Sequence, residues 1–232
     1  MKVISVLAAL SFACIPSLNK PVMPSQLTMM GIKGQVKIMT TYSFSSEQKG
    51  SDTSKAYYRT IRYFDKDGYM LWSQNRLIPY WDSDGPSLSR IVYNYDKPNT
   101  IEWSEYDSNG VASRMGVTRF LNPKEYRDSS VNLQDGQLML LNSKLNENFR
   151  ESEYDFLVVD ADRDTLLNEH TSMLMEGGHV IAMYRHDIKR NEKDTTDLIG
   201  IQYDSHGNRT QTLIESRVTE SKQFHMVYFQ YY

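Results

Sequence analysis

A short pattern recurs at three places in this chain: an aromatic residue, an aspartate, two polar residues and a glycine. It occupies residues 64–68, 106–110 and 203–207, each time between runs rich in β-branched and aromatic residues. An aspartate side chain can accept hydrogen bonds from backbone N–H groups just ahead of it, and glycine adopts the positive φ that a short hairpin loop needs. Each copy therefore predicts the tip of a β-hairpin.

The segments between these tips have the period of half-buried strands. In the first of them, Val36, Ile38, Thr40 and Tyr42 alternate with more polar neighbours, which is the two-residue period of a strand. Similar runs are expected at residues 57–64, 69–74, 89–95, 100–106, 111–120, 137–141, 154–159, 179–186, 197–203, 209–218 and 224–231. Strands do not alternate with helices, so a parallel sheet is not expected. The sequence predicts an all-β fold: an antiparallel meander of about a dozen strands, as an open twisted sheet or half-barrel.

Three segments are less clear. Residues 122–128 begin with Asn-Pro and are interpreted as a helical turn. Residues 165–175 fit either helical or strand spacing, and residues 187–196 are so charged that they are expected to form an exposed loop.

Composition limits the classes of function. The chain has 232 residues, of which 40% are hydrophobic, and its mean hydropathy is −0.56, so much of the sheet should face water. Net charge is −3, and lysine and arginine are scattered. A nucleic-acid-binding protein would carry a basic stripe, so no nucleic-acid partner is expected.

The N-terminus indicates export. Residues 3–13 are almost wholly apolar after Lys2, and Ser11 and Ala13 supply the small residues of a cleavage site. This is the pattern of a secretory signal peptide. We expect a signal peptide at residues 1–13, a proline-containing flexible leader at 14–30, and a single antiparallel β domain at 31–232. The expected location is the periplasm, the outer membrane surface or the extracellular space.

Cys14, the only cysteine, follows the proposed cleavage site directly. It is a candidate for lipidation as in bacterial lipoproteins, and the lipid would be the only contact with a membrane. Leu10 lies one place too far from Cys14 for the usual motif, so a plain secreted protein is the alternative. In either case no disulfide forms within the chain.

The tips at residues 106–110 and 203–208, with residues 64–68 as a near copy, resemble the YD repeats of RHS-type bacterial surface and toxin-shell proteins. Their spacing here is uneven, unlike the regular arrays of that family. With the signal peptide and the Gly-x-Lys-Gly-x-Val-Lys sequence at residues 31–37, the whole chain resembles small envelope proteins of Gram-negative bacteria. The resemblance implies a β-sheet scaffold outside the cytoplasm and brings no catalytic residues.

Metal sites are not expected. Asp160, Asp162 and Asp164 have the spacing of the first ligands in a calcium-binding EF-hand loop, but Thr165 and Thr171 stand where glycine and glutamate are required. A solvated acidic loop is the better interpretation. The five histidines lack the spacing that puts two ligands on one face: His170, His179, His186, His206 and His225. No cofactor is predicted.

Catalytic residues are not expected either. Glu102 and Glu105 are three apart on a predicted strand and should point to opposite faces. Glu151 and Glu153 should share a face, exposed at the start of a strand. A desolvated pair of carboxylates and a nucleophile motif are both missing from the sequence. We expect a protein that is not an enzyme, with a hydrolase as the second alternative.

Tyr80 and Trp81 are the best candidates for binding. Pro79, Gly85 and Pro86 keep them out of the sheet, and exposed aromatic residues on loops often bind partners. The alternative is that both rings pack into the core. The sequence thus predicts an exported, non-enzymatic binding or scaffold module of the bacterial cell envelope, with an unknown protein or glycan as partner. A half-barrel that carries a lipid or other apolar ligand is the first alternative.

Overall fold

The computed structural model describes residues 23–45, 52–77 and 87–232. The expected signal peptide at residues 1–13, Cys14, Tyr80 and Trp81 lie outside these ranges, so the predictions made for them stay predictions.

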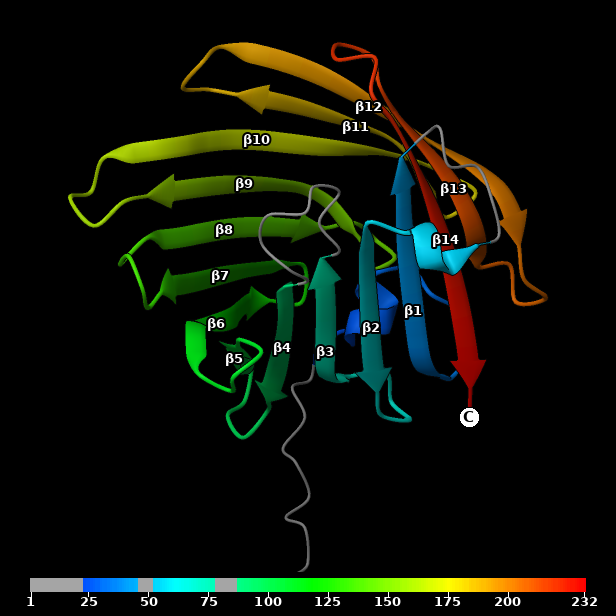
Figure 1. The fold of residues 1–232 in the computed structure, drawn as a ribbon, viewed down its shortest axis with the longest axis horizontal. Coiled ribbons are helices and arrows are strands. Elements are labelled where there is room, and N and C mark those ends of the chain that lie inside the picture. Colours follow the sequence, from blue (N-terminus) through cyan, green and yellow to red (C-terminus); the bar gives the residue numbers. More distant parts are fainter. Residues whose placement is uncertain (1–22, 46–51, 78–86) are drawn as a thin grey trace, which may run out of the picture.

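Fourteen strands of the described residues form one closed antiparallel barrel (Figure 1). Each strand pairs with the next one along the chain, and β14 pairs with β1 to close the barrel. The strands are β1 Val36–Ser45, β2 Tyr58–Phe64, β3 Met70–Leu77, β4 Ser87–Asn94, β5 Thr100–Tyr106, β6 Ala112–Asn122, β7 Glu125–Asn132, β8 Leu138–Leu145, β9 Glu151–Val159, β10 Thr165–Glu176, β11 His179–Asp187, β12 Glu192–Tyr203, β13 Arg209–Ser216 and β14 Lys222–Tyr231. The described residues also form two short helices, α1 Gln26–Met29 and η2 Thr53–Lys55. The predicted antiparallel meander is confirmed, but the open sheet or half-barrel is wrong because the first and last strands pair.

Two segments differ from the sequence-based expectation. Residues 122–128 do not form a helical turn: β6 ends at Asn122 and β7 begins at Glu125. The expected loop at residues 187–196 is shorter, since β12 begins at Glu192. Its charged residues can enter a strand because they have partners on β11: Asp194, for example, pairs with Arg185 (3.3 Å). The ambiguous segment 165–175 is a strand, β10.

Because the strands run antiparallel, their connections alternate between the two ends of the barrel. The turns after β2, β4, β6, β8, β10 and β12 lie at the end where the chain enters β1 and leaves β14. We call this the helix end, because α1 lies there. The other end, with the connections after β5, β7, β9, β11 and β13, is the loop end.

All three predicted hairpin tips have the expected geometry. Gly68, Gly110 and Gly207 have φ of 87°, 78° and 78°. In each tip the aspartate Oδ1 accepts two backbone N–H groups, as Asp107 does from Asn109 (2.8 Å) and Val111 (2.9 Å). The matching bonds at the other two tips have lengths between 2.8 and 3.0 Å. The recurring pattern is therefore a repeated turn, as predicted.

Substituting alanine at two of these glycines should have unequal effects. A Cβ at Gly110 would meet nothing within 4 Å, so Gly110→Ala should cost only the left-handed backbone strain of roughly 1–2 kcal/mol. A Cβ at Gly68 would lie 2.7 Å from Ser25 Oγ and 3.2 Å from Leu27, so Gly68→Ala should cost more. Denaturant midpoints would measure both, with exposed Ser108→Ala as the control that changes little. Equal losses of stability in Gly68→Ala and Gly110→Ala would contradict the packing of Ser25 and Leu27 on the turn that contains Gly68.

The helix α1 closes part of the helix end. Its N-cap is Ser25, whose side chain accepts the N–H of Thr28. Leu27 is buried against apolar residues of β1, β2 and β3, and its N–H donates to Gly68 O (3.2 Å). Gln26 Oε1 accepts the N–H of Met70 (3.1 Å). Within the expected leader at residues 14–30, Gln26–Met29 thus form a short helix, and Leu27 gains apolar burial inside the barrel.

The third hairpin tip fixes the chain that leads from α1 into β1. Asn208 is 1% exposed. Its Oδ1 accepts the N–H of Lys33 (2.7 Å), and its Nδ2 donates to Lys33 O (2.8 Å) and Tyr231 Oη (2.9 Å). The Tyr231 hydroxyl in turn donates to Asp204, and the ring of His206 stacks on Tyr231 (4.2 Å). This network joins β13, β14 and the entry to β1 where the barrel closes.

These bonds also shift two pKa values. Burial raises the pKa of Asp204, but hydrogen bonds from Tyr231, Asn208 and His206 outweigh it, so the pKa lies below its usual value. Burial and the hydrogen bond to Asp204 raise the pKa of Tyr231 to about 12. The Tyr231 hydroxyl therefore keeps its proton, and Asp204 stays ionised, across the neutral range.

Candidate functional site: the interior of the barrel

Two of the cavities in the interior border on α1. Cavity A, of about 380 Å³, is lined by inward-facing residues of β3 to β9 with Gln26 and Met29. Cavity B, of about 340 Å³, is lined by residues of β1 and β9 to β14 with the chain from Met29 to Ile32. Both volumes lie in the range of about 300–1,000 Å³ that is typical of small-molecule sites. The barrel interior is therefore the candidate site.

Cavity A is mainly apolar. Its wall includes Ile101, Phe120, Met139, Leu141 and Phe156. These side chains share the inner face because each strand presents alternate residues to the same side. At the helix end the lining merges with a buried cluster: Tyr69, Tyr95, Ile101, Phe120, Tyr126 and Leu145. The wall offers mostly apolar contact area to a bound molecule.

A few polar groups lie in the same wall. Asp128 accepts the indole N–H of Trp103 (3.0 Å) and the hydroxyl of Thr118. Arg114 forms an ion pair with Glu105 (3.5 Å), but its Nε is buried with no hydrogen-bond partner in the part of the chain that the structure describes. Burial raises the pKa of Tyr93, so its hydroxyl stays protonated. These groups are few against the apolar lining, as is usual for ligand cavities.

Cavity B combines methionines with basic groups. Six methionines line it: Met29, Met30, Met39, Met173, Met175 and Met183. Arg150, His179 and Arg209 lie in the same lining, next to the turns of the helix end. Burial lowers the pKa of His179, and the charges of Arg209, Lys33 and Arg150 lower it further. Methionine side chains adapt to irregular shapes, so this wall can fit differently shaped apolar groups.

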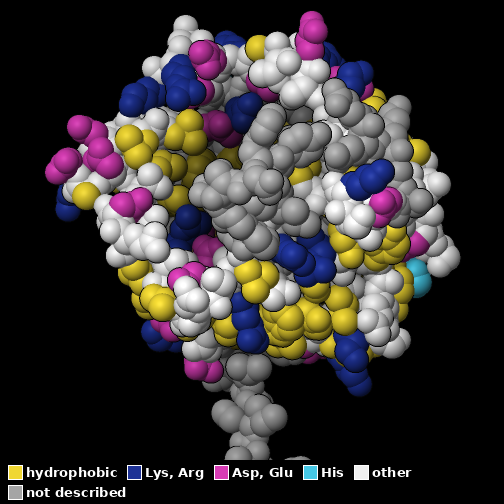
Figure 2. Space-filling model, in the orientation of Figure 1, with side chains coloured by type: hydrophobic (Ala, Val, Ile, Leu, Met, Phe, Trp, Pro, Cys, Tyr) yellow, Lys and Arg dark blue, Asp and Glu magenta, His cyan; other side chains and the backbone are white. Residues whose placement is uncertain are grey.

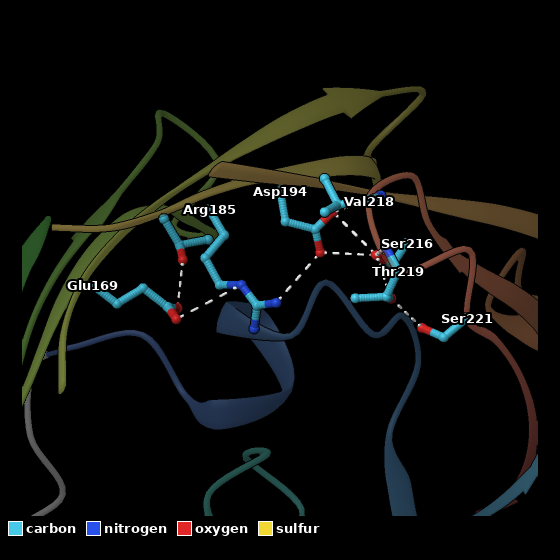
Figure 3. Close-up of polar contacts among 8 residues, drawn as sticks. Glu169, Arg185, Asp194, Ser216, Val218, Thr219 and Ser221 are labelled. Carbon is cyan, nitrogen blue, oxygen red and sulfur yellow. Dashed lines mark hydrogen bonds and ion pairs between the residues drawn. The ribbon is translucent and has the colours of Figure 1, made fainter. Parts of the chain in front are cut away.

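Toward the loop end the interior becomes polar (Figure 3). Arg185 on β11 lies between Glu169 on β10 (3.7 Å) and Asp194 on β12 (3.3 Å). Asp194 also accepts the hydroxyl of Ser216 on β13 (3.0 Å), and Thr219 in the following turn donates to Ser216 Oγ (2.8 Å). The labelled residues come from β10 to β13 and from the turn that follows β13, and hydrogen bonds and ion pairs connect them. The loop end of the interior thus carries a connected group of charged and hydroxyl side chains.

The carboxylates considered for catalysis do not converge. Glu102 and Glu105 point to opposite faces as predicted, because Glu102 pairs with Lys97 (2.5 Å) and Glu105 with Arg114 inside. Glu151 and Glu153 do not share a face, contrary to the prediction. A register shift in β8–β9 beside Leu145 turns Glu151 inward, where Tyr126 donates to it, while Glu153 pairs with Lys144 (2.5 Å) outside.

The acidic stretch at residues 160–164 is a hairpin turn. Asp160 Oδ1 accepts the N–H of Asp164 (2.8 Å), and Arg163 has φ of 70°. Within residues 23–45, 52–77 and 87–232, no three His, Cys, Asp or Glu side chains gather where they could hold a metal ion. His170 contacts Asp155 (2.8 Å), while His225 lines cavity B, where burial lowers its pKa.

Three further aromatic residues of the predicted strands have structural roles. Tyr69 is buried in the core, and its hydroxyl donates to Met23 O (2.8 Å). Trp103 lines cavity A. Trp72 stacks on Tyr63 across β2 and β3 (3.7 Å), with Arg90 over its ring (4.8 Å). The proposed binding role of Tyr80 and Trp81 stays a prediction.

The outer face carries charged pairs between neighbouring strands. Lys144 and Glu153 join β8 to β9 (2.5 Å), and Lys222 and Glu215 join β14 to β13 (2.8 Å). On the face in Figure 2, hydrophobic side chains lie in separate groups among basic, acidic and other polar ones. No helix among the described residues is long and apolar enough to cross a membrane.

The sequence did not identify the interior residues of either cavity. A signal was present, since Glu105 alternates with Ile101 and Trp103 and so shares their inward face. Which face is enclosed, however, depends on closure of the barrel, and that was not predicted.

Comparisons with known proteins support the fold. No family model and no curated protein matches the sequence. Among solved structures, a porin-like protein from Bacteroides vulgatus has a TM-score of 0.51 at 7% identity, covering 84% of this chain and 99% of that one. A porin-like protein from Bacteroides uniformis has a TM-score of 0.44 at 9% identity, covering 89% and 100%. The first likeness shows that the closed barrel is a known architecture.

Proposed function

We propose that this chain is an exported, non-enzymatic barrel of the bacterial envelope that holds an apolar ligand in its interior. The proposal rests mainly on cavity A, which lies inside the closed barrel, has a volume of about 380 Å³ and has a mainly apolar wall. Burial of apolar surface is worth about 25 cal/mol per Å², so this wall favours an apolar guest. Export rests on the signal-peptide pattern at residues 1–13.

The outer face favours a barrel in water over one that spans a lipid bilayer. A charged side chain on the lipid face of a membrane barrel costs about 2–4 kcal/mol near the midplane for lysine or arginine. Here exposed Arg90 on β4 and the pair His170–Asp155 lie at mid-strand on the outer face. Lys144–Glu153 and Lys222–Glu215 lie nearer the strand ends, where the cost is smaller. These outward charges support a location in the periplasm or at the outer membrane surface.

The similarity to porin-like proteins raises passage of solutes as the competing function. A pore requires a polar, water-filled interior from one end to the other. In this barrel, α1 and buried apolar residues occupy the helix end, among them Leu27, Phe64 and Met70. This arrangement supports storage of a ligand more than passage through the barrel.

The test is a fluorescence titration of the full chain, purified without detergent, with the uncharged apolar dye N-phenyl-1-naphthylamine. We expect saturable binding. Leu141→Trp should weaken it at least about tenfold, or 1.4 kcal/mol, because the larger ring fills cavity A.

Leu140→Trp is the matched control, since Leu140 is the next residue on β8 and faces outward. It should bind the dye as the wild type does. Absence of saturable binding, or equal binding by both variants, would refute a ligand in cavity A. Conductance across a planar bilayer would favour a pore instead.

A further inference from the structure

Two arginines at the helix end of cavity B have buried N–H groups that find no partner among the described residues. Arg150 ends the turn between β8 and β9, and Arg209 begins β13. Arg209 donates from Nη1 to Val180 O (2.6 Å), but its Nε has no hydrogen-bond partner among the described residues. The same holds for Nη1 of Arg150. Both side chains line cavity B.

Unpartnered groups of this kind are costly. A buried donor left without an acceptor loses about 1–3 kcal/mol, and more when it is charged. Nearly all buried polar groups in folded proteins are paired, so an exception calls for an explanation such as an absent ion. Two such donors in one cavity point to an acceptor that comes from outside the chain.

The chain offers these arginines little negative charge. Within the described residues, neither guanidinium forms an ion pair with a carboxylate. Glu151 also lines the cavity, but its carboxylate already accepts from Tyr126 and Ser143. The charges of Lys33, Arg150 and Arg209 all act on His179 and lower its pKa, after burial, which is the larger cause. The helix end of cavity B therefore has a positive potential.

The backbone leaves space for the Arg150 guanidinium. A Cβ at Gly31 would lie 2.9 Å from Arg150 Cζ, and one at Gly178 would lie 2.8 Å from Nη1. Both glycines have positive φ. Side chains at either position would displace the guanidinium, so these two turns hold it beside the cavity.

Most of the remaining wall is apolar. Beyond the arginines the cavity is bounded by Met173, Met183, Leu198, Val227 and Phe229. A molecule that fills this space must therefore offer an acceptor of negative charge at one end and apolar surface along the rest.

We propose that cavity B binds an amphipathic anion, an alkyl or acyl chain that ends in a carboxylate or a phosphate. Arg150 and Arg209 bind the acid group, and the methionine-rich wall contacts the chain. This inference rests on the proposed function and names the ligand class for the same interior.

The test is isothermal titration calorimetry of the full chain with dodecanoic acid, dodecyl phosphate and 1-dodecanol. The two acids should each bind at least about tenfold more tightly than the uncharged alcohol, because a charge-assisted hydrogen bond contributes at least 1.4 kcal/mol. Their relative affinities distinguish a carboxylate ligand from a phosphate ligand.

Arg150→Gln and Arg209→Gln should remove the preference for acids and keep the affinity for dodecanol, whereas Arg150→Lys should retain part of the preference. Arg127→Gln, an exposed arginine on β7, should behave as wild type. The melting temperature of ligand-free Arg150→Gln should not fall, because the substitution removes an unpaired buried donor.

Equal affinities for acids and alcohol would overturn the inference, and so would an acid preference that survives both glutamine substitutions. In those cases binding of dodecanol and of the naphthylamine dye would leave the proposed function standing. If neither the alcohol nor the dye binds, the proposed function fails as well.

Discussion

Asn208→Ala should lower the free energy of unfolding by about 3 kcal/mol, because it removes three hydrogen bonds that each contribute about 0.5–1.5 kcal/mol. The substitution removes the three hydrogen bonds to Lys33 and Tyr231. Lys33 is 175 residues away in sequence, so the loss loosens the barrel where its first and last strands meet. Denaturant unfolding monitored by circular dichroism would measure it.

The matched control is Ser205→Ala in the same turn. Ser205 is exposed, and its substitution should change stability by less than about 0.5 kcal/mol. Similar midpoints for the two variants would mean that Asn208 does not hold the closing strands together.

Gly116→Val should cost about 3 kcal/mol or more, at the upper end of what inserting a side chain into a packed interior costs. Gly116 on β6 pairs with Trp103 on β5, and the indole ring occupies the place where a side chain of residue 116 would lie. A displaced ring would also stop donating to Asp128. The positive-φ strain of the hairpin glycines plays no part, because Gly116 is not among the glycines with positive φ.

Thermal unfolding and near-ultraviolet circular dichroism would report the change at Gly116, since both respond to tight packing of the tryptophan. Met115→Val on the same strand is the control, because Met115 is 49% exposed and faces outward. A stable Gly116→Val protein with an unchanged aromatic spectrum would show that the Trp103 ring does not occupy the space beside Gly116.

The turns show how far local sequence determines this fold. The glycine of the recurring pattern identified the tips at Gly68, Gly110 and Gly207, and all three glycines have positive φ in the structure. Residues 146–150 and 160–164 form similar turns that the sequence did not identify as such, because Phe149 and Arg163 hold positive φ of 57° and 70°. Asn146 and Asp160 accept the backbone bonds there. The aspartate or asparagine that starts the turn is therefore the more general sequence signal for these hairpin tips. A glycine three positions later is present in only some of them.

Closure was not predictable from local pattern. A period of two tells which residues share a face, but it does not tell that Val36 and Tyr231 lie on strands that pair. That pairing requires contacts across almost the whole chain, including the bonds of Asn208 to Lys33. Without closure, an inward face and a solvated face look alike in the sequence.

The residues of the candidate site could not be predicted from local pattern either. Arg150 and Arg209 stand beside turns, and nothing in their local sequence separates them from exposed arginines such as Arg127. Only the closed barrel brings both to one cavity with Met173 and Met183. The alternation of Ile101, Trp103 and Glu105 was one local sign of a polar group on an apolar face.

The most direct test of a ligand-holding interior is diffraction at the bromine absorption edge from crystals soaked with 1-bromododecane. Bromine scatters anomalously, so its position is found without assumptions about the chain. The account predicts a peak inside the barrel among Ile101, Leu141 and Phe156, the apolar wall of cavity A. Peaks confined to the outer face, with none between the strands and α1, would contradict it.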